Sequence, residues 1–130
     1  MIDKIAWLHL VDGRILSTRS RGKQVYYLPG GKREAGETDT ETLVREIREE
    51  VSVEITEPTI EPAGVFEAQA DGKAPGVVVR MTCFTAEYTG TLEASSEIDE
   101  IAWLGYADRE KVSAVDKIIF DHLHEAGQLT

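Results

Sequence analysis

The sequence is poor in cysteine, in positive charge and in long apolar runs. Its one cysteine, Cys83, has no partner for an internal disulfide, which fits a reducing compartment. Lysine and arginine number 14 against 24 aspartates and glutamates, a formal net charge of -10. This balance argues against binding to a nucleic acid polymer or to anionic lipid. A small phosphorylated ligand stays open, because metal bound by acidic side chains reverses the local charge.

No apolar stretch approaches the roughly 18 residues that a membrane span needs. The first residues also lack a basic segment followed by a long apolar run. We therefore expect a cytoplasmic protein. Its 130 residues, 42% of them hydrophobic, suit a single domain over residues 1–130 with a core of its own.

Strand patterns dominate the first thirty residues. Residues 5–11 are apolar on both alternating faces, which predicts a strand covered on both sides. Asp12-Gly13 predicts a hairpin turn, with the returning strand over residues 14–19. Residues 25–28 predict a short strand that ends at the Pro-Gly-Gly turn of residues 29–31.

Two helices are predicted farther along the chain. Residues 38–52 combine an apolar stripe at helical spacing with a capping box of Thr38 and Glu41. A second amphipathic pattern predicts a helix that begins at residue 112 or 113 and ends near residue 126.

The region between the helices is rich in strand-forming residues. Residues 54–72 predict strand pieces and loops, because Pro58 and Pro62 interrupt them. Residues 77–88 predict the longest and most central strand, and residues 101–104 a short one. The fold class predicted is α/β, a mixed sheet with a helix on each face.

Three glutamates of the first helix, Glu46, Glu49 and Glu50, share one face, because their spacing is i, i+3, i+4. Two unit charges about 5 Å apart repel by roughly 3 kcal/mol at an effective dielectric of about 20. Such a cluster is well solvated, partly protonated or bound to cations. Oxygen ligands without histidine or cysteine favour Mg²⁺ or Mn²⁺. The alternative is an ordinary solvated acidic face.

The segment from Gly31 to Val53 resembles the box motif of the Nudix hydrolase family. That pattern fixes glycine, glutamate, arginine and aliphatic positions at set spacings. The matching residues are Gly31, Glu37, Arg45, Glu46, Ile47, Glu49, Glu50 and Val53. Ser52 stands where the family has glycine. Serine in a left-handed helix end costs on the order of 1 kcal/mol, but the change removes no ligand.

The resemblance implies an αβα sandwich that hydrolyses nucleoside diphosphates linked to another group, with a divalent metal. By position, the metal ligands would be Glu46, Glu49, Glu50 and the carbonyl of Gly30. Glu37 and Arg45 would form a supporting ion pair. One helix glutamate or a loop acid would deprotonate the attacking water.

Further candidates lie outside the box. In similar proteins an acid of the loop before the tryptophan strand contacts metal or acts as the base, and Glu97 and Glu100 both fit by position. Either could instead belong to an ordinary polar loop. Cationic partners for phosphate are Lys32, Arg21 and Arg19, with solubilising surface charge as the alternative. Tyr27 could stack on a base or pack in the core.

The small size and the Leu-Pro-Gly-Gly-Lys turn of residues 28–32 look like the MutT-like members. We therefore expect a (deoxy)nucleoside triphosphate pyrophosphohydrolase, an acid anhydride hydrolase. ADP-ribose and sugar nucleotides are alternative substrates, because the box binds only what all of them share. A ligand-sensing module without catalysis is a further alternative, which the intact box glutamates argue against. By analogy the protein could be a homodimer.

Overall fold

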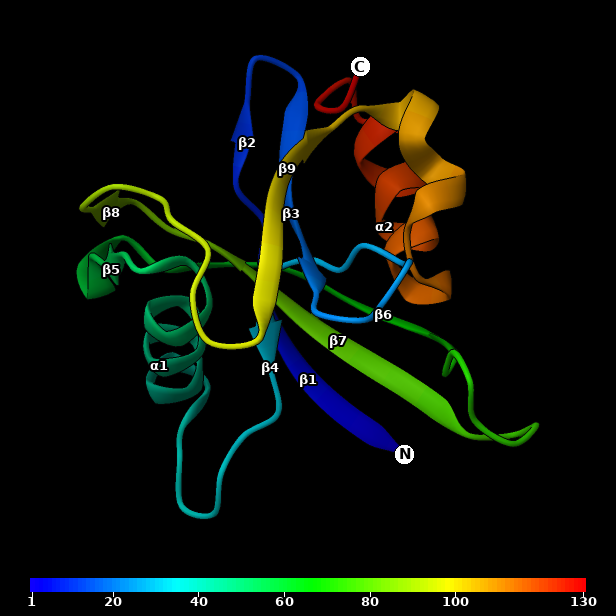
Figure 1. The fold of residues 1–130 in the computed structure, drawn as a ribbon, viewed down its shortest axis with the longest axis horizontal. Coiled ribbons are helices and arrows are strands. Elements are labelled where there is room, and N and C mark those ends of the chain that lie inside the picture. The colour runs from blue at the N-terminus through cyan, green and yellow to red at the C-terminus, as the bar shows by residue number, and fades with distance from the viewer.

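The computed structural model describes residues 1–130, and two helices cover opposite sides of a layer of strands (Figure 1). The helices are α1 (Asp39–Val51) and α2 (Ala114–Glu125). The strands are β1 (Ile2–Trp7), β2 (Leu10–Val11), β3 (Arg14–Ser20), β4 (Gly30–Gly31), β5 (Glu54–Ile55), β6 (Glu61–Gln69), β7 (Val78–Thr85), β8 (Tyr88–Thr89) and β9 (Ile98–Leu104). Two short 3₁₀ helices span Glu57–Thr59 and Tyr106–Lys111. The α/β prediction with a helix on each side is confirmed.

The strands form a mixed sheet and two antiparallel ones. The mixed sheet has the order β4-β1-β7-β6, and in it β1 runs parallel to β7. The second sheet has the order β2-β3-β9, and β5 pairs with β8. The single strand predicted for residues 5–11 is wrong: β1 ends at Trp7 and β2 begins at Leu10. The strand is interrupted there because β1 pairs within one sheet and β2 within the other.

The strand predicted for residues 25–28 is also wrong. Tyr26 and Tyr27 make only isolated bridges, and the paired segment is β4, which lies antiparallel to β1. Pro29 cannot donate a backbone hydrogen bond. It accepts one instead from the N–H of Trp7, at 2.9 Å.

The longest strand is β6, which the sequence predicted as pieces and loops. Pro62 lies inside it, next to a shift of register against β7. Proline is tolerated there because β6 is the edge of its sheet, where one row of N–H groups has no ladder partner. The central strand β7 is shorter than predicted and ends at Thr85, three residues before β8 begins.

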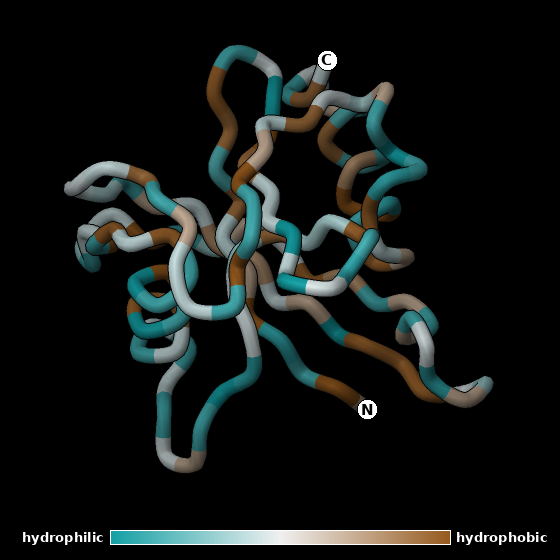
Figure 2. The backbone as a smooth tube through the Cα atoms, in the orientation of Figure 1, coloured by the Kyte–Doolittle hydropathy of each residue, from teal (hydrophilic) through white to brown (hydrophobic).

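The core has two halves, one on each side of the layer of strands. Alternate residues of β1 face different helices: Ile5 and Trp7 pack with Leu43 and Ile47 of α1, whereas Ala6 packs in the half that α2 covers. Figure 2 shows hydrophobic residues along the central strands and a mostly hydrophilic segment between β4 and α1. The prediction that the residues of this segment are apolar on both faces and covered on both sides is therefore confirmed for Ile5 to Trp7 of β1.

Local signals set the helix ends. Thr38 and Glu41 form both halves of the capping box of α1, and Ser52 ends that helix in the left-handed conformation with φ 66°. Ser113 caps α2 through its side chain, which accepts from the N–H of Asp116. No helix is long and apolar enough to cross a membrane.

Candidate functional site

The site begins at the entry to α1, where Glu37 is held from several sides. Arg45 donates to Glu37 from Nε at 2.6 Å and from Nη2 at 2.9 Å. The backbone N–H of Glu34 and the hydroxyl of Thr42 donate to the same carboxylate. These bonds, above all those from Arg45, lower the pKa of Glu37 to about 2. The carboxylate is therefore ionised at neutral pH and ties the preceding loop to the helix.

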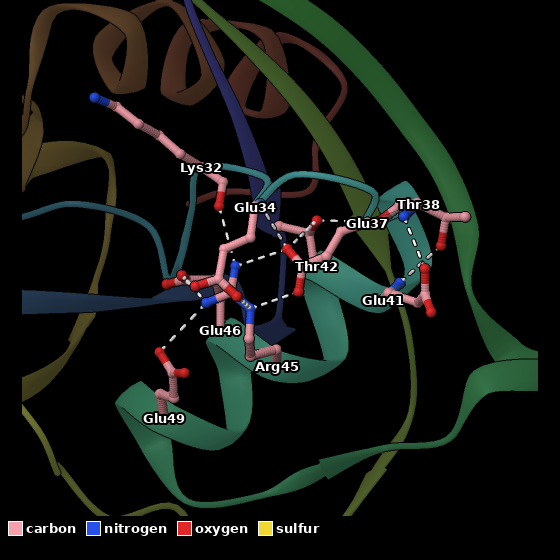
Figure 3. A network of polar contacts seen from close by, with 9 residues as sticks. All are labelled: Lys32, Glu34, Glu37, Thr38, Glu41, Thr42, Arg45, Glu46 and Glu49. Carbon is pink, nitrogen blue, oxygen red and sulfur yellow. Dashed lines mark hydrogen bonds and ion pairs between the residues drawn. The ribbon is translucent and has the colours of Figure 1, made fainter.

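Arg45 also binds beyond this pair (Figure 3). Its Nη1 donates to Glu46 at 2.6 Å and to Glu49 at 3.4 Å, and its Nη2 donates to the carbonyl of Lys32 at 3.1 Å. One guanidinium thus contacts the loop and two of the three helix glutamates. An arginine has the planar fork of donors that such shared binding requires.

The two glycines of β4 let the turn approach its neighbours closely. Gly30 has φ +149°, and a Cβ there would collide with the carbonyl oxygen of Ile5. A Cβ on Gly31 would collide with the carboxylate of Glu46. Gly30 thus requires glycine, whereas a side chain at residue 31 would displace the carboxylate of Glu46, and the absence of side chains brings β1, β4 and α1 together at one place.

Glu50 lies partly buried at that place. It accepts a hydrogen bond from the N–H of Gly30 at 2.9 Å. Burial raises the pKa of Glu50 to about 8, the N–H of Gly30 opposes the rise, and the charges of Glu46 and Glu97 add to it. Burial likewise raises the pKa of Glu46, against the effect of Arg45. The ionised forms of both carboxyls would therefore be stabilised by a cation.

A cavity of about 510 Å³ opens over these groups. Acidic and basic side chains meet in its walls, although the chain as a whole is strongly acidic. The charged residues that line it are Glu34, Glu46, Glu50, Glu97, Lys4, Lys23, Lys32, Arg33 and Arg45. Such a mixed lining suits an anion that arrives with a metal ion.

Their spacing predicts that the three box glutamates point to one place, but in the structure their carboxylates do not meet. No group of three or more His, Cys, Asp or Glu side chains is gathered as a metal centre would be. Arg45 binds Glu46 and Glu49, whereas Glu50 turns to Gly30. The donors nevertheless fit a hard divalent ion, because all of them are oxygens and two are carboxylates with raised pKa.

The remaining candidate residues fall into two groups. Glu97, Lys32 and Tyr27 line the cavity, together with Gly30 and Gly31. Four other candidates, Arg19, Arg21, Glu49 and Glu100, do not line it.

Each of the four has a partner in the structure, and that of Glu49 is Arg45. Arg19 binds Asp99 at 3.3 Å and Glu100 at 3.2 Å, because β3 and β9 place Arg19 opposite Glu100. Tyr26 also donates to Glu100. The Arg21 side chain donates to the carbonyl of Ser96. Of the two loop acids, Glu97 is therefore the one that faces the cavity.

Sequence reasoning missed several charged residues near the site: Arg33 and Glu34 of the cavity lining, and also Lys4 and Asp116. Lys4 comes from the middle of β1 and lines both this cavity and a second one of about 280 Å³. Asp116 of α2 is fully buried and accepts a hydrogen bond from the N–H of Leu28 at 3.0 Å. Asp116 carried only the ordinary signal of an acid in the first turn of a helix, and Lys4 in a strand carried none.

Known proteins resemble this chain in sequence and in fold. An uncharacterized Nudix hydrolase of Bacillus subtilis, YvcI, is 26% identical over 92 residues, which are 71% of this chain and 58% of that protein. The E. coli ORF135 protein has a TM-score of 0.75 at 24% identity, over 97% of this chain and 92% of that one. The MutT protein of Bacillus halodurans has a TM-score of 0.74 at 25% identity, over 99% of this chain and 86% of that one.

The family comparison covers more of the chain than the box does. The model of the NUDIX domain matches residues 5–123, from β1 to the end of the apolar stripe of α2. Its span includes the Glu37–Arg45 pair, the glycine turn and the cavity that Glu50 lines. The chain belongs to the NUDIX domain family.

Proposed function

We propose that this chain is a metal-dependent pyrophosphohydrolase of nucleoside diphosphate-linked compounds, with a (deoxy)nucleoside triphosphate as the favoured substrate. One observation carries the proposal. The carboxylates of Glu46, Glu50 and Glu97 and the cations Lys4 and Lys32 line the same cavity. Carboxylates hold the metal and the lysines bind phosphate oxygens, so both requirements of phosphoryl chemistry are met within one cavity.

The metal ligands proposed are Glu46, Glu49, Glu50 and the carbonyl of Gly30, with Glu97 as a further one. Mg²⁺ or Mn²⁺ suits such oxygen donors. When bound, the ion neutralises the diphosphate and acts as a Lewis acid on it. Glu49 does not line the cavity, so its part requires the contact with Arg45 to loosen.

The chain's own residues would position the reaction. Water attacks one phosphorus of the diphosphate, the bridging P–O bond breaks, and the leaving phosphate departs with the bridging oxygen. Of the acids that line the cavity, Glu50 and Glu97 are the candidates to accept the proton of that water. Lys32 lies beside the glycine turn and neutralises charge on the substrate phosphates.

The second cavity supports a nucleoside-bearing substrate. It shares Lys4, Tyr27, Lys32 and Met81 with the first cavity, so the two spaces adjoin. Seven of its 13 lining residues are hydrophobic, against 4 of 17 in the first. We place the phosphates in the polar space and the base in the apolar one, where Tyr27 offers a ring for stacking.

A substrate panel tests this function. The purified protein is incubated with Mg²⁺ or Mn²⁺ and with deoxynucleoside triphosphates, oxidised ones included, ADP-ribose and sugar nucleotides. Release of pyrophosphate from a triphosphate is the expected result, and EDTA should abolish it. Turnover of ADP-ribose or a sugar nucleotide alone would replace the substrate assignment. Tight binding without turnover of any compound would favour the sensor alternative. That the protein forms a homodimer stays a prediction, which sedimentation velocity can test by measuring the mass of the particle in solution.

A further inference from the structure

Ser52, the departure from the box pattern, makes two contacts at the end of α1. Its backbone N–H donates to the carbonyl of Arg48 at 3.2 Å, and its hydroxyl donates to the carbonyl of Glu93 at 2.9 Å. Glu93 lies 41 residues farther along the chain. Glycine could adopt the same left-handed backbone without strain, but it has no hydroxyl to make the second contact.

The segment that Ser52 reaches also caps the helix. The last carbonyls of any α-helix have no N–H partner within it. Here the N–H of Glu93 donates to the backbone carbonyl of Val51 at 3.0 Å, and the N–H of Ser95 donates to the backbone carbonyl of Glu50 at 3.0 Å. The hydroxyl of Ser95 donates to the carbonyl of Glu49. Residues 93–95 therefore bind the last turn of α1, the turn that carries two of the box glutamates.

This segment leads directly to Glu97. Two residues beyond Ser95, the carbonyl of Glu97 accepts from the N–H of Arg21 at 2.8 Å, which fixes the other end of the short loop. Glu97 lines the same cavity as Glu50. The position of Glu97 relative to Glu50 is thus set over only a few residues, by contacts to α1 on one side and to Arg21, the residue after β3, on the other.

We propose that Ser52 is a positioning residue: with Ser95, it fastens residues 93–97 to the end of α1 and so holds Glu97 beside Glu50. The inference rests on the proposed function in taking Glu50 and Glu97 as carboxylates of the metal site. It explains the serine, because the hydroxyl contact compensates for the left-handed strain that glycine would avoid.

The test compares the double variant Ser52→Gly/Ser95→Ala with the wild type. Glycine keeps the left-handed backbone at residue 52, so the helix end stays intact while both hydroxyl contacts are lost. Ser96→Ala is the matched control, because Ser96 also has a positive φ, 56°, yet only its carbonyl is bonded, to Arg21. Ser52→Asn is the rescue variant, since asparagine tolerates this backbone and its amide can donate to Glu93.

Two measurements are made on each variant: amide hydrogen exchange at Glu93 and Ser95, and Mn²⁺ binding followed by electron paramagnetic resonance. In the double variant we expect faster exchange at both amides and Mn²⁺ binding weaker by about tenfold, the usual loss when a group that orients metal ligands is removed. Ser96→Ala should match the wild type in both. The single variant Ser52→Gly is measured beside Ser52→Asn, and Ser52→Asn should keep most of what Ser52→Gly loses.

The outcomes separate the positioning role from the function. Wild-type Mn²⁺ affinity in the double variant overturns the positioning role, whether or not exchange becomes faster, since a merely structural contact would change exchange alone. Equal losses in Ser96→Ala also overturn it. A wild-type protein that binds no Mn²⁺ and hydrolyses no nucleotide refutes the proposed function instead.

Discussion

Two acids, one from each helix, bind the same turn, Glu50 partly buried and Asp116 fully buried. Glu50 of α1 accepts from the N–H of Gly30 at 2.9 Å, and Asp116 of α2 accepts from the N–H of Leu28 at 3.0 Å. Burial is the main cause that raises both pKa values, that of Glu50 to about 8 and that of Asp116 to about 7. The two interactions are alike in geometry and in electrostatics.

Their surroundings differ. Glu50 lines the large cavity, and the charges of Glu46 and Glu97 act on it. Asp116 lines neither that cavity nor the smaller one beside it, and its Oδ1 atom has no hydrogen-bond partner. A raised pKa alone therefore does not identify a functional acid. Access to a cavity shared with other carboxylates is what separates Glu50 from Asp116.

The largest expected effect is that of Glu50→Gln on activity. Glutamine keeps an oxygen that can accept from Gly30 and loses the charge that a metal needs. We expect turnover to fall by a factor on the order of 10³ or more, while the thermal midpoint stays near that of the wild type. Steady-state assays and thermal unfolding check both. Wild-type rates in this variant would remove Glu50 from the site.

A second prediction concerns Arg45, which has no counterpart beside Asp116. Arg45→Ala leaves Glu37 and Glu46 without their shared partner. We expect turnover to fall by about 10- to 100-fold, with a lower thermal midpoint. The matched control is Arg48→Ala on the same helix, because Arg48 makes one exposed pair with Glu54. An unchanged midpoint in Arg45→Ala would count against the Glu37 pair as a support of the fold.

Asp116 should affect the pH dependence of stability more than activity. Its raised pKa means that the protonated carboxyl stabilises the fold fully below pH 3.8, the ordinary pKa of an aspartic acid, and that this stabilisation is lost as pH rises through about 7. Asparagine does not titrate. Urea unfolding should therefore show the stability of Asp116→Asn relative to wild type improving by roughly 2 kcal/mol from pH 5 to pH 7. Parallel pH profiles would contradict the buried, protonated state.

The sequence was sufficient where the signals are local. The capping box and Ser52 lie within the helix they delimit, so the bounds of α1 could be predicted from their spacing. Such contacts depend on local backbone geometry that the pattern itself specifies. The pair of Glu37 and Arg45, eight residues apart across the helix entry, was expected from the resemblance to the family box and not from the pattern alone.

The pairing and register of strands that are distant in the chain could not be predicted from the sequence. Arg19 meets Glu100 only because β3 and β9 pair in one particular register, and that pairing gives Arg19, a predicted partner of phosphate, an ion pair that the sequence did not indicate. The parallel pairing of β1 with β7 was likewise not predictable, since alternation of apolar residues specifies a face and not a neighbour. Lys4 was missed for the same reason.

Lys4 gives the smallest and last effect, and it connects the two acids. Its positive charge partly opposes the rise of the pKa of Glu50 and of Asp116. Its Nζ lies 5.6 Å from the ring centroid of Tyr27. Lys4→Met should raise KM by about fivefold, which is about 1 kcal/mol, with little change in kcat. Lys73 lines the smaller cavity alone, so Lys73→Met should raise KM less. Equal effects would mean that Lys4 binds only the base and does not reach the phosphates.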